Sequence, residues 1–361
     1  MLNEKVEVFF KALGDKSFSV SPIALEFSLF GNTVTIRWYG VMIALGFLLA
    51  VLFGGRMAYK WKMNLDKMVD VLIGGTIGGI LGARIYYVLF NLEQYKGRFG
   101  DIFKIWEGGL AIYGGLIGGL LGAFVVCRIR KLNFLNLMDL AGMSFLIGQG
   151  IGRWGNFTNQ EAFGTNTNLP WGMWSQNTAN YIYSQQQFFA DHGITNVYAG
   201  TAQDMAYVHP TFLYESIWCL LSFGVLYFIC KYARRFSGQL MLCYGILYGA
   251  ERCFVEGLRL DSLYIGGSAV RVSQLLSGLL AAGCLAALIF FSLKFKLHPR
   301  PIEGIDYFPE LEALAAAKAK PAGAADEAEA PVDEGPAPEK GETGGVGGEG
   351  DGSEDEMSED S

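Results

Sequence analysis

Long apolar runs constrain the fold of this 361-residue chain more than any other feature of its sequence. A membrane-spanning helix needs about 20 predominantly apolar residues. Runs of that length lie near residues 39–59, 69–90, 108–127, 134–152, 209–230, 238–256 and 270–293. Because backbone polar groups within lipid must be satisfied inside the segment, helices are the structure these runs favour. We therefore expect an all-α polytopic membrane protein with about seven transmembrane helices.

Basic residues follow the first, third, fifth and seventh runs. They are Arg56, Lys60, Lys62, Lys67, Arg128, Arg130, Lys131, Lys231, Arg234, Arg235, Lys294, Lys296 and Arg300. Residues 153–208, in contrast, contain a single basic residue, Arg153. Positively charged connections tend to stay in the cytoplasm. We therefore expect the N-terminus and residues 153–208 outside the cell, and the C-terminus inside.

Charge also separates an acidic tail from the membrane body. Residues 301–361 hold 18 acidic and three basic residues, so the net charge of −7 describes the tail rather than the body. From Lys318 onward the tail has almost no large apolar residues and cannot bury a core. We expect a transmembrane domain in residues 1–300, with an external cap segment at about 153–208, and a disordered cytoplasmic tail in residues 301–361.

Two further features bear on location and chemistry. The N-terminus lacks the basic region and apolar core of a signal peptide. Residues 18–30 are too short to span a membrane, and we expect an interfacial segment there. The six cysteines lie in or beside apolar runs without a CxxC pair. They are expected to be free, buried thiols, with no disulfide framework and no metal site.

The stretch GQGIGRWGNFTNQEAFG at residues 148–164 ends an apolar run with a group of polar side chains. Arg153, Asn156, Asn159 and Glu161 lie within nine positions. A charged residue at a bilayer centre costs about 2.5–3.5 kcal/mol on insertion scales, so Arg153 is a functional candidate. The alternative is an interfacial arginine whose head extends to water. The neighbouring amides, carboxylate and glycines favour a polar pocket.

Other charged residues lie within the apolar runs. Arg84 is well inside one, and its alternative role is an ion pair with an acidic residue on another helix. Glu215, in HPTFLYE at residues 209–215, needs a cation. Arg252, Glu256 and Arg259 are spaced i, i+4, i+7 and so share one helical face. Their alternative is an Arg252–Glu256 pair that serves packing alone.

The remaining candidates also have ordinary alternatives. Tyr39, in WYG at residues 38–40, could belong to the aromatic belt of the membrane. His209 could act at the start of a helix whose first turn contains Pro210. The glycines of WEGGLAIYGG at residues 106–115 allow tight helix packing, which leaves Tyr113 unexplained.

These groups all approach the predicted outer half of the membrane. We expect one cavity to collect Arg84, Arg153, Arg252, Glu161, Glu215 and Glu256. A planar guanidinium group binds phosphate oxygens bidentately. From the residues alone, the chain is a membrane protein that binds a phospholipid headgroup in the outer leaflet.

The stretch GRWGNFTNQEAFG at residues 152–164 resembles the signature of the prolipoprotein diacylglyceryl transferases, G-R-x-G-N-F-x-N-x-E-x-x-G, with each fixed position filled. Other motifs resemble that family in the same order: WYG at 38–40, GAR at 82–84, WEGGLAIYGG at 106–115, HPTFLYE at 209–215 and YGAERCFVEGLR at 248–259. The resemblance covers about residues 20–300 and leaves out the tail.

The resemblance implies an enzyme of the bacterial cytoplasmic (inner) membrane, with its active site towards the outer leaflet. The reaction would move a diacylglyceryl group from phosphatidylglycerol to the lipobox cysteine in the signal peptide of a prolipoprotein. A thioether forms and glycerol-1-phosphate leaves. No metal, dissociable cofactor or nucleic acid is implied, and residues 1–300 would be the catalytic domain.

The resemblance also implies roles for individual residues. Arg153 and Asn156 would contact the headgroup, and Arg252 would clamp the leaving phosphate. Tyr39 and Tyr248 would be essential polar partners. The other residues expected to bind phosphatidylglycerol are Asn159, Glu161, Gly164, Arg84, Glu215, Glu256 and Arg259, with Gly164 allowing close backbone approach.

One position departs from the family. Many members carry His where this chain has Tyr113, and that histidine has been interpreted as the general base. A phenol, with an ordinary pKa of about 10, is a poor base at neutral pH unless cations lower that pKa. Three possibilities stay open for the general base. It could be Tyr113 assisted by an arginine, it could be His209, or there could be no dedicated base because the positive field of the site ionises the thiol. We favour the last.

A lipid transporter or flippase without covalent chemistry is the alternative function. Transporters often show inverted repeats and helices broken at the midplane. The sequence has no convincing internal repeat, and its polar groups lie towards one side of the membrane. A structural scaffold would not need several intramembrane arginines and glutamates. Transfer chemistry is therefore the leading hypothesis.

Overall fold

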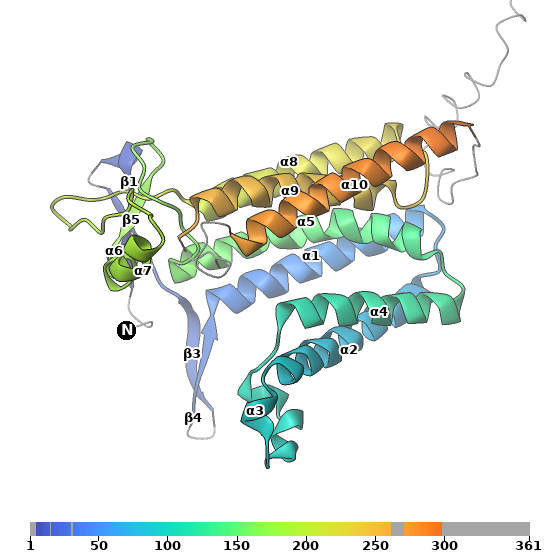
Figure 1. Cartoon of the computed structure of the whole chain (residues 1–361), viewed down its shortest axis with the longest axis horizontal. Coiled ribbons are helices and arrows are strands. Elements are labelled where there is room, and N and C mark those ends of the chain that lie inside the picture. Colours follow the sequence, from blue (N-terminus) through green and yellow to red (C-terminus); the bar gives the residue numbers. More distant parts are fainter. Residues whose placement is uncertain (1–4, 15, 30–31, 261–270, 298–361) are drawn as a thin grey trace, which may run out of the picture. The chain divides into compact units, whose positions relative to one another are not determined.

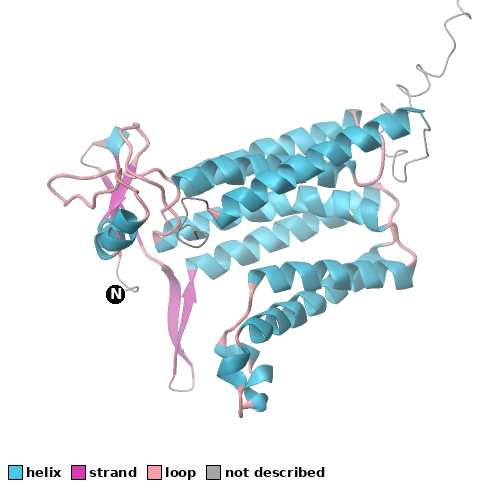
Figure 2. Ribbon diagram, viewed as in Figure 1, coloured by secondary structure: helices cyan, strands magenta, loops and turns pink. Residues whose placement is uncertain are grey.

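The computed structural model describes residues 5–14, 16–29, 32–260 and 271–297. Long helices dominate this part of the chain (Figure 2). The predicted acidic tail, residues 301–361, lies outside the described residues.

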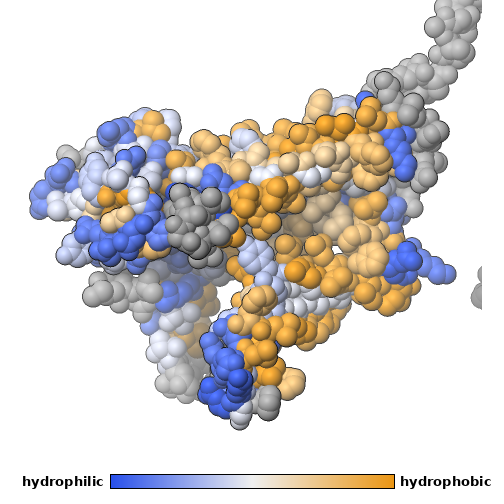
Figure 3. All heavy atoms as spheres, viewed as in Figure 1, coloured by the Kyte–Doolittle hydropathy of each residue, from blue (hydrophilic) through white to orange (hydrophobic). Residues whose placement is uncertain are grey.

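Among the described residues, six helices are long and apolar enough to cross a membrane. They are α1 (Trp38–Lys60), α2 (Leu65–Phe90), α4 (Ile112–Arg130), α5 (Phe134–Asn159), α8 (Thr211–Tyr232) and α10 (Val272–Leu297). Each overlaps a predicted run. Apolar side chains cover the visible face of the long helices (Figure 3), as expected for surfaces in contact with lipid. The chain is a multi-pass membrane protein.

Helix α9 (Gln239–Leu258) corresponds to the sixth predicted run, near residues 238–256. At a rise of about 1.5 Å per residue, its length of about 30 Å suits a membrane. It is not among the six candidate spans, and it carries Glu251, Arg252 and Glu256. The sixth predicted span is therefore a helix of the right length that is less apolar than the six candidate spans.

The start of α4 differs from its prediction near residue 108. Gly108 and Gly109 have φ angles of 89° and 70°, a left-handed backbone that glycine adopts without a steric penalty. These glycines lie in the connection, and the helix begins at Ile112.

The protein is mostly helical, but the prediction of an all-α fold needs correction, because the described residues also form two small sheets. The strands are β1 (Val6–Phe10), β2 (Ser17–Val20), β3 (Ile23–Leu29), β4 (Asn32–Arg37) and β5 (Met173–Ser175). One sheet has the order β2-β1-β5 and the other pairs β3 with β4, all antiparallel. Alternating polar and apolar residues, several of them β-branched, explain these strands. Much of the expected interfacial segment, residues 18–30, lies in β2 and β3.

Residues 153–208 pair with the N-terminal strands. In β5, Ser175 lies opposite Val8 of β1. The short helices α6 (Gln176–Ser184) and α7 (Gln186–Asp191) follow. Val8, Phe163, Met173, Ile182, Phe189, Val208, Phe212 and Leu260 form a buried apolar cluster here. The segment is therefore folded. A further short helix, α3 (Leu92–Tyr95), follows α2.

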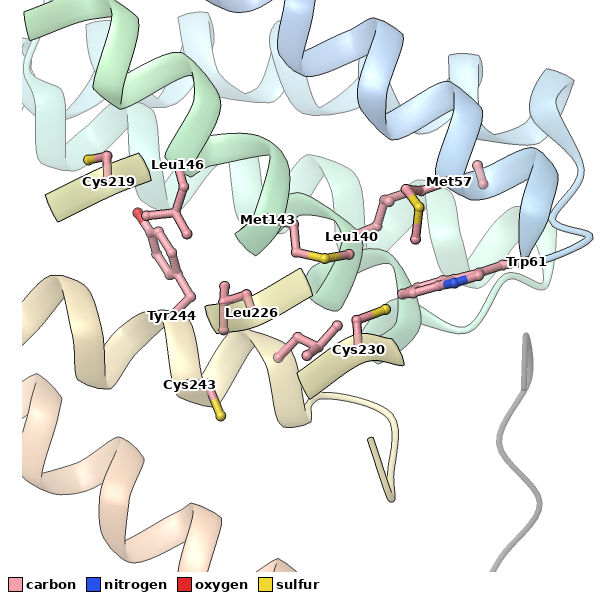
Figure 4. Close-up of a cluster of buried hydrophobic side chains, with 12 residues drawn as sticks. Met57, Trp61, Leu140, Met143, Leu146, Cys219, Leu226, Cys230, Cys243 and Tyr244 are labelled. Carbon is pink, nitrogen blue, oxygen red and sulfur yellow. The ribbon is translucent and has the colours of Figure 1, made fainter. Parts of the chain in front are cut away.

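Helix α5 lies at the centre of the helix packing, with contacts to α1, α8 and α9, while α10 packs on α9 (Figure 1). Figure 4 shows the buried cluster that these contacts create, with Met57 from α1, Trp61 directly after it, Met143 from α5, Leu226 from α8 and Tyr244 from α9. All six cysteines are free, and four of them are buried, two less so.

Helices α2 and α4 form a separate pair that glycine makes possible. A Cβ atom built on Gly82 would overlap the carbonyl oxygen of Gly114, and one on Gly118 would overlap that of Gly78. Small residues at four-residue spacing let membrane helices approach closely. Gly114 of the WEGGLAIYGG motif and Gly118 beyond it therefore have a packing role.

Candidate active site

Glu215 is the point where three arginines from different parts of the chain meet. It lies in the second turn of α8 and is 1% exposed. Arg153 Nη1 is 2.9 Å from its Oε2, and Arg252 Nη1 is 3.0 Å from its Oε1. Arg259 Nη1 is 3.9 Å from the same Oε1. The carboxylate thus joins the end of α5, the start of α8 and the end of α9.

Arg252 is held by two carboxylates. Its Nη2 is 2.8 Å from Glu256 Oε2, one helical turn further along α9. Arg252 and Glu256 do form the pair that was considered as a packing contact. Arg252 also pairs with Glu215 of α8, so its role extends beyond packing within α9. The side chains of Glu215 and Glu256 are 1% and 3% exposed, while those of Arg153 and Arg252 are 22% and 18% exposed. The positive groups are therefore the accessible part of the cluster.

The turn after α5 gathers the polar residues of the signature. Asn156 Nδ2 donates to Glu161 Oε1 at 2.9 Å, and Asn159 Nδ2 donates to the same oxygen at 3.3 Å. Gln160, the residue that ends the helix, has a left-handed backbone. This turn lets Glu161 fold back on the two amides, so that the three side chains lie three to eight residues after Arg153 in the sequence.

Gly164 ties the signature to the other two elements of the site. Its N–H donates to His209 O, and Thr165 N–H donates to Leu258 O, both at 2.9 Å. A Cβ atom at Gly164 would lie 2.9 Å from that of His209 and 3.1 Å from Leu258 O. The close approach at Gly164 is thus to the protein's own backbone, between the start of α8 and the end of α9.

The sequence profile of one family, prolipoprotein diacylglyceryl transferase, matches residues 24–290. This chain belongs to that family. Three curated relatives carry the name phosphatidylglycerol–prolipoprotein diacylglyceryl transferase. The one from Finegoldia magna is 40% identical over 273 residues, which is 75% of this chain and 95% of the relative. One from Listeria monocytogenes is 40% identical over 282 residues, 78% of this chain and 94% of the relative. One from Thermotoga maritima is 42% identical over 248 residues, which is 68% of this chain and 77% of the relative.

Two tyrosines that the family resemblance singled out lie beside the cluster. A Cβ atom on Gly155 of the transferase signature would be 2.8 Å from Cδ2 of Tyr39, so the Tyr39 ring packs directly on the signature helix. Tyr248 precedes Arg252 by one turn of α9 and stacks on Tyr244 with ring centroids 5.8 Å apart.

Arg84 is not brought to the cluster. Its guanidinium donates to the backbone carbonyls of Asp101, Ile102, Gly108 and Gly109 at 2.7–2.9 Å. These contacts differ from both predictions for Arg84, which were a place in the headgroup site and an ion pair with an acidic residue on another helix. Arg84 instead binds the carbonyl groups of the connection between α2 and α4.

The two residues considered as bases have different settings. Tyr113 lies in the first turn of α4 and is 48% exposed. His209 Nδ1 is 3.0 Å from the hydroxyl of Tyr214, which accepts from Trp171 Nε1 at 2.8 Å. Burial lowers the pKa of His209 below its ordinary value, which favours the neutral ring.

Sequence reasoning missed Glu251. This residue is 6% exposed, and its charge interacts with those of Arg153, Arg252 and Glu215. A sequence signal existed, because an acidic residue inside a predicted span needs an explanation as much as Glu215 does. The candidates on this helix were chosen by the i, i+4, i+7 spacing of Arg252, Glu256 and Arg259. Glu251 does not fit that spacing and was therefore not chosen.

Proposed function

We propose that this chain transfers the diacylglyceryl group of phosphatidylglycerol to the thiol of a prolipoprotein lipobox cysteine. The products are a thioether and glycerol-1-phosphate. The observation that carries the proposal is the convergence of Arg153, Arg252 and Arg259 on Glu215, within a chain of the diacylglyceryl transferase family. The protein is accordingly a transferase in lipoprotein lipidation, and the relatives do not favour a transporter.

The buried carboxylates orient the arginines before substrate binds. Arg153 and Arg252 each direct one side of the guanidinium group at Glu215, and Arg252 also engages Glu256. Each η nitrogen of arginine carries two N–H groups, so the accessible side keeps donors for phosphate oxygens. Groups fixed in this way stabilise developing charge without reorganising.

The negative charge that develops on the leaving phosphate is the charge that the site must stabilise most. The thiolate attacks the glyceryl carbon that bears the phosphate ester, the C–O bond breaks and charge develops on the departing phosphate. Arginines that bind this charge more strongly than the diester stabilise the transition state over the ground state. We assign Arg252 to the leaving phosphate and Arg153 to the headgroup.

The other site residues support these two arginines. Asn156, Asn159 and Glu161 form the signature turn and would contact the glycerol headgroup, while Tyr39 and Tyr248 would line the site beside α5 and α9. For Arg84 we propose a structural role in the α2–α4 connection, because backbone carbonyls occupy its guanidinium.

The topology we propose has seven membrane helices, with α9 as the sixth. The site is built from the end of α5, the start of α8 and the end of α9. Lys60, Arg130 and Lys231, in contrast, lie in the last turns of α1, α4 and α8. By the positive-inside rule, the N-terminus and the folded segment 153–208 are outside and the C-terminus is cytoplasmic. The site then opens towards the outer leaflet of the bacterial cytoplasmic membrane.

A mass measurement tests the function. Purified protein is mixed with phosphatidylglycerol of one chain composition and a peptide carrying a lipobox cysteine, with a Cys→Ser peptide as the control. A mass gain of one diacylglyceryl group on the cysteine peptide alone is the expected result. Binding of lipid without any mass gain would contradict transfer and support a transporter.

A further inference from the structure

Glu251 has a carboxylate that the site described so far does not use. It lies on α9, immediately before Arg252, and is 6% exposed. Its Oε1 is fully buried and accepts no hydrogen bond from the described residues. A buried carboxylate oxygen without a hydrogen bond is unfavourable for folding, since it loses its contact with water. Its presence beside the reaction site therefore calls for an explanation in function.

The carboxylate of Glu251 lies within the electrostatic reach of the arginine cluster. Its charge interacts with those of Arg153, Arg252, Arg259 and Glu215. Glu251 immediately precedes Arg252 on α9, and Arg252 pairs with Glu215 and Glu256. A group bound to the arginines would have Glu251 as a neighbour.

The ion pairs of the site, rather than its hydrogen bonds, set Glu251 apart from the other acidic residues, since single oxygens of Glu215 and Glu256 also lack a hydrogen bond within the described part of the chain. Glu161 accepts from two amides, and Glu215 and Glu256 pair with guanidinium groups. Donors and cations favour the charged form of a carboxylate and so weaken its tendency to take up a proton. Glu251 makes no close ion pair among the described residues, so it keeps more of that tendency than Glu215 or Glu256, and this tendency is the property of a general base.

The alternative bases are less well placed. His209 Nδ1 is engaged with the hydroxyl of Tyr214, at the start of α8. Tyr113 lies on α4, which pairs with α2, and α2 and α4 do not contribute to the ion pairs of Glu215 within the described residues. Glu251 lies on the helix that supplies Arg252 to those ion pairs.

We propose that Glu251 is the general base that accepts the proton of the lipobox thiol, an assignment that rests on the proposed transferase function. The S–H bond breaks, the proton moves to a carboxylate oxygen of Glu251, and the electron pair stays on sulfur. The thiolate forms the S–C bond as the C–O bond to phosphate breaks. The proton then passes from the carboxylic acid to the departing glycerol phosphate, which restores the carboxylate. Hydrogen bonds of this kind often close only when substrate binds.

The test compares two nucleophiles in the full-length enzyme. Glu251→Gln preserves shape and removes the base. With a cysteine lipobox peptide we expect transfer to fall about 100- to 10,000-fold, the range for loss of a general base. A selenocysteine peptide ionises at neutral pH without help, so the same variant should retain most of the wild-type rate on it. Glu93→Gln, an exposed carboxylate on α3, is the matched control and should behave as wild type on both peptides.

Each outcome decides the assignment. Unchanged turnover of the cysteine peptide by Glu251→Gln would overturn it, as would an equal loss on both peptides, which indicates a structural role. If Glu251→Gln does not fold, Glu251→Asp replaces it, with the selenocysteine-to-cysteine rate ratio expected to rise above that of wild type and an unchanged ratio counting against the base. Failure of the wild-type enzyme to modify the cysteine peptide at all would reject the transferase function itself.

Discussion

At the scale of single residues, Glu215 determines where the arginines of the site point. Its two oxygens lie 2.9 and 3.0 Å from Arg153 and Arg252. These residues are 62 and 37 positions away in the chain. Removing one partner of a buried ion pair costs about 3–5 kcal/mol, because a charge stays behind without compensation. The site and the stability of the bundle therefore depend on the same contacts.

Arg252→Ala should lower diacylglyceryl transfer by about 100- to 1,000-fold, as for loss of one donor to a developing oxyanion. Arg252→Lys should also be impaired, because an ammonium group cannot hold Glu215 and Glu256 with one planar fork. Transfer rates with the lipobox peptide check both. Arg128→Ala, at an exposed position of α4, is the control and should match wild type. Normal turnover by a folded Arg252→Ala enzyme would contradict its role.

His209 makes stability sensitive to acid. Burial lowers its pKa in the folded protein, whereas in the unfolded chain a histidine titrates near about 6.5. The unfolded state therefore binds the proton more readily. The stability that a neutral His209 contributes is present above about pH 6.5 and is lost as the pH falls below that value. We expect the drop in thermal midpoint between pH 7.5 and 5.5 to be smaller in His209→Gln than in wild type. An equal drop in both would show that His209 is not responsible.

At the scale of helices and strands, Asp139 fixes the start of α9. Its carboxylate accepts from the backbone N–H groups of Gly238 and Met241 at 2.8 and 3.0 Å, and Arg234 Nη2 donates to it at 3.0 Å. The guanidinium of Arg234 also stacks 4.2 Å from the ring of Trp61. This buried network joins α1, α5 and the α8–α9 connection at the end of α5 opposite Arg153.

Asp139→Ala should destabilise the protein by about 3–5 kcal/mol, since it leaves Arg234 buried without its carboxylate and removes two acceptors at the start of α9. Thermal unfolding in detergent measures the effect. Asp191→Ala, on α7 at the surface, provides a matched acidic control with little expected change. A thermal midpoint of Asp139→Ala within about a degree of wild type would contradict the role of the network.

The α2–α4 pair offers a matched test of close packing. A Cβ atom on Gly118 would overlap the backbone of Gly78 and lie 2.8 Å from Cα of Gly82. One on Gly79 would lie 3.5 Å from Gly115 O, an ordinary contact. Gly118→Ala should therefore destabilise by about 1–3 kcal/mol through overpacking. Gly79→Ala should be neutral or slightly stabilising. Equal thermal midpoints for the two variants would be incompatible with this interface.

At the scale of the whole molecule, the long helices could be predicted because each needs only a continuous apolar run. The strands were missed because segments of four or five residues, such as SFSV and VEVFF, carry little signal until a partner strand is known. The contacts of Arg84 could not be predicted, since its acceptors are backbone carbonyls that leave no trace in the sequence. The need of Glu215 for a cation was anticipated, but the meeting of three arginines at Glu215 and the presence of Glu251 were not.

The proposed topology predicts which side of the membrane each end of the bundle occupies. Tyr183→Cys, at an exposed position of α6, should react with a membrane-impermeant maleimide in intact cells. Lys131→Cys, exposed after α4, should react only after the membrane is opened. The native cysteines are buried or partly buried and give a low background. Labelling of Lys131→Cys from outside would reverse the orientation.

The most direct test of the central claim follows the phosphate. Phosphatidylglycerol labelled in its headgroup is incubated with the enzyme and a lipobox peptide, and released label is compared with modified peptide. We predict one glycerol phosphate released for each peptide that gains a diacylglyceryl group, because the bond that breaks joins the glyceryl carbon to the phosphate oxygen. Label retained on the peptide, or a peptide carrying a single acyl chain, would contradict the proposed reaction.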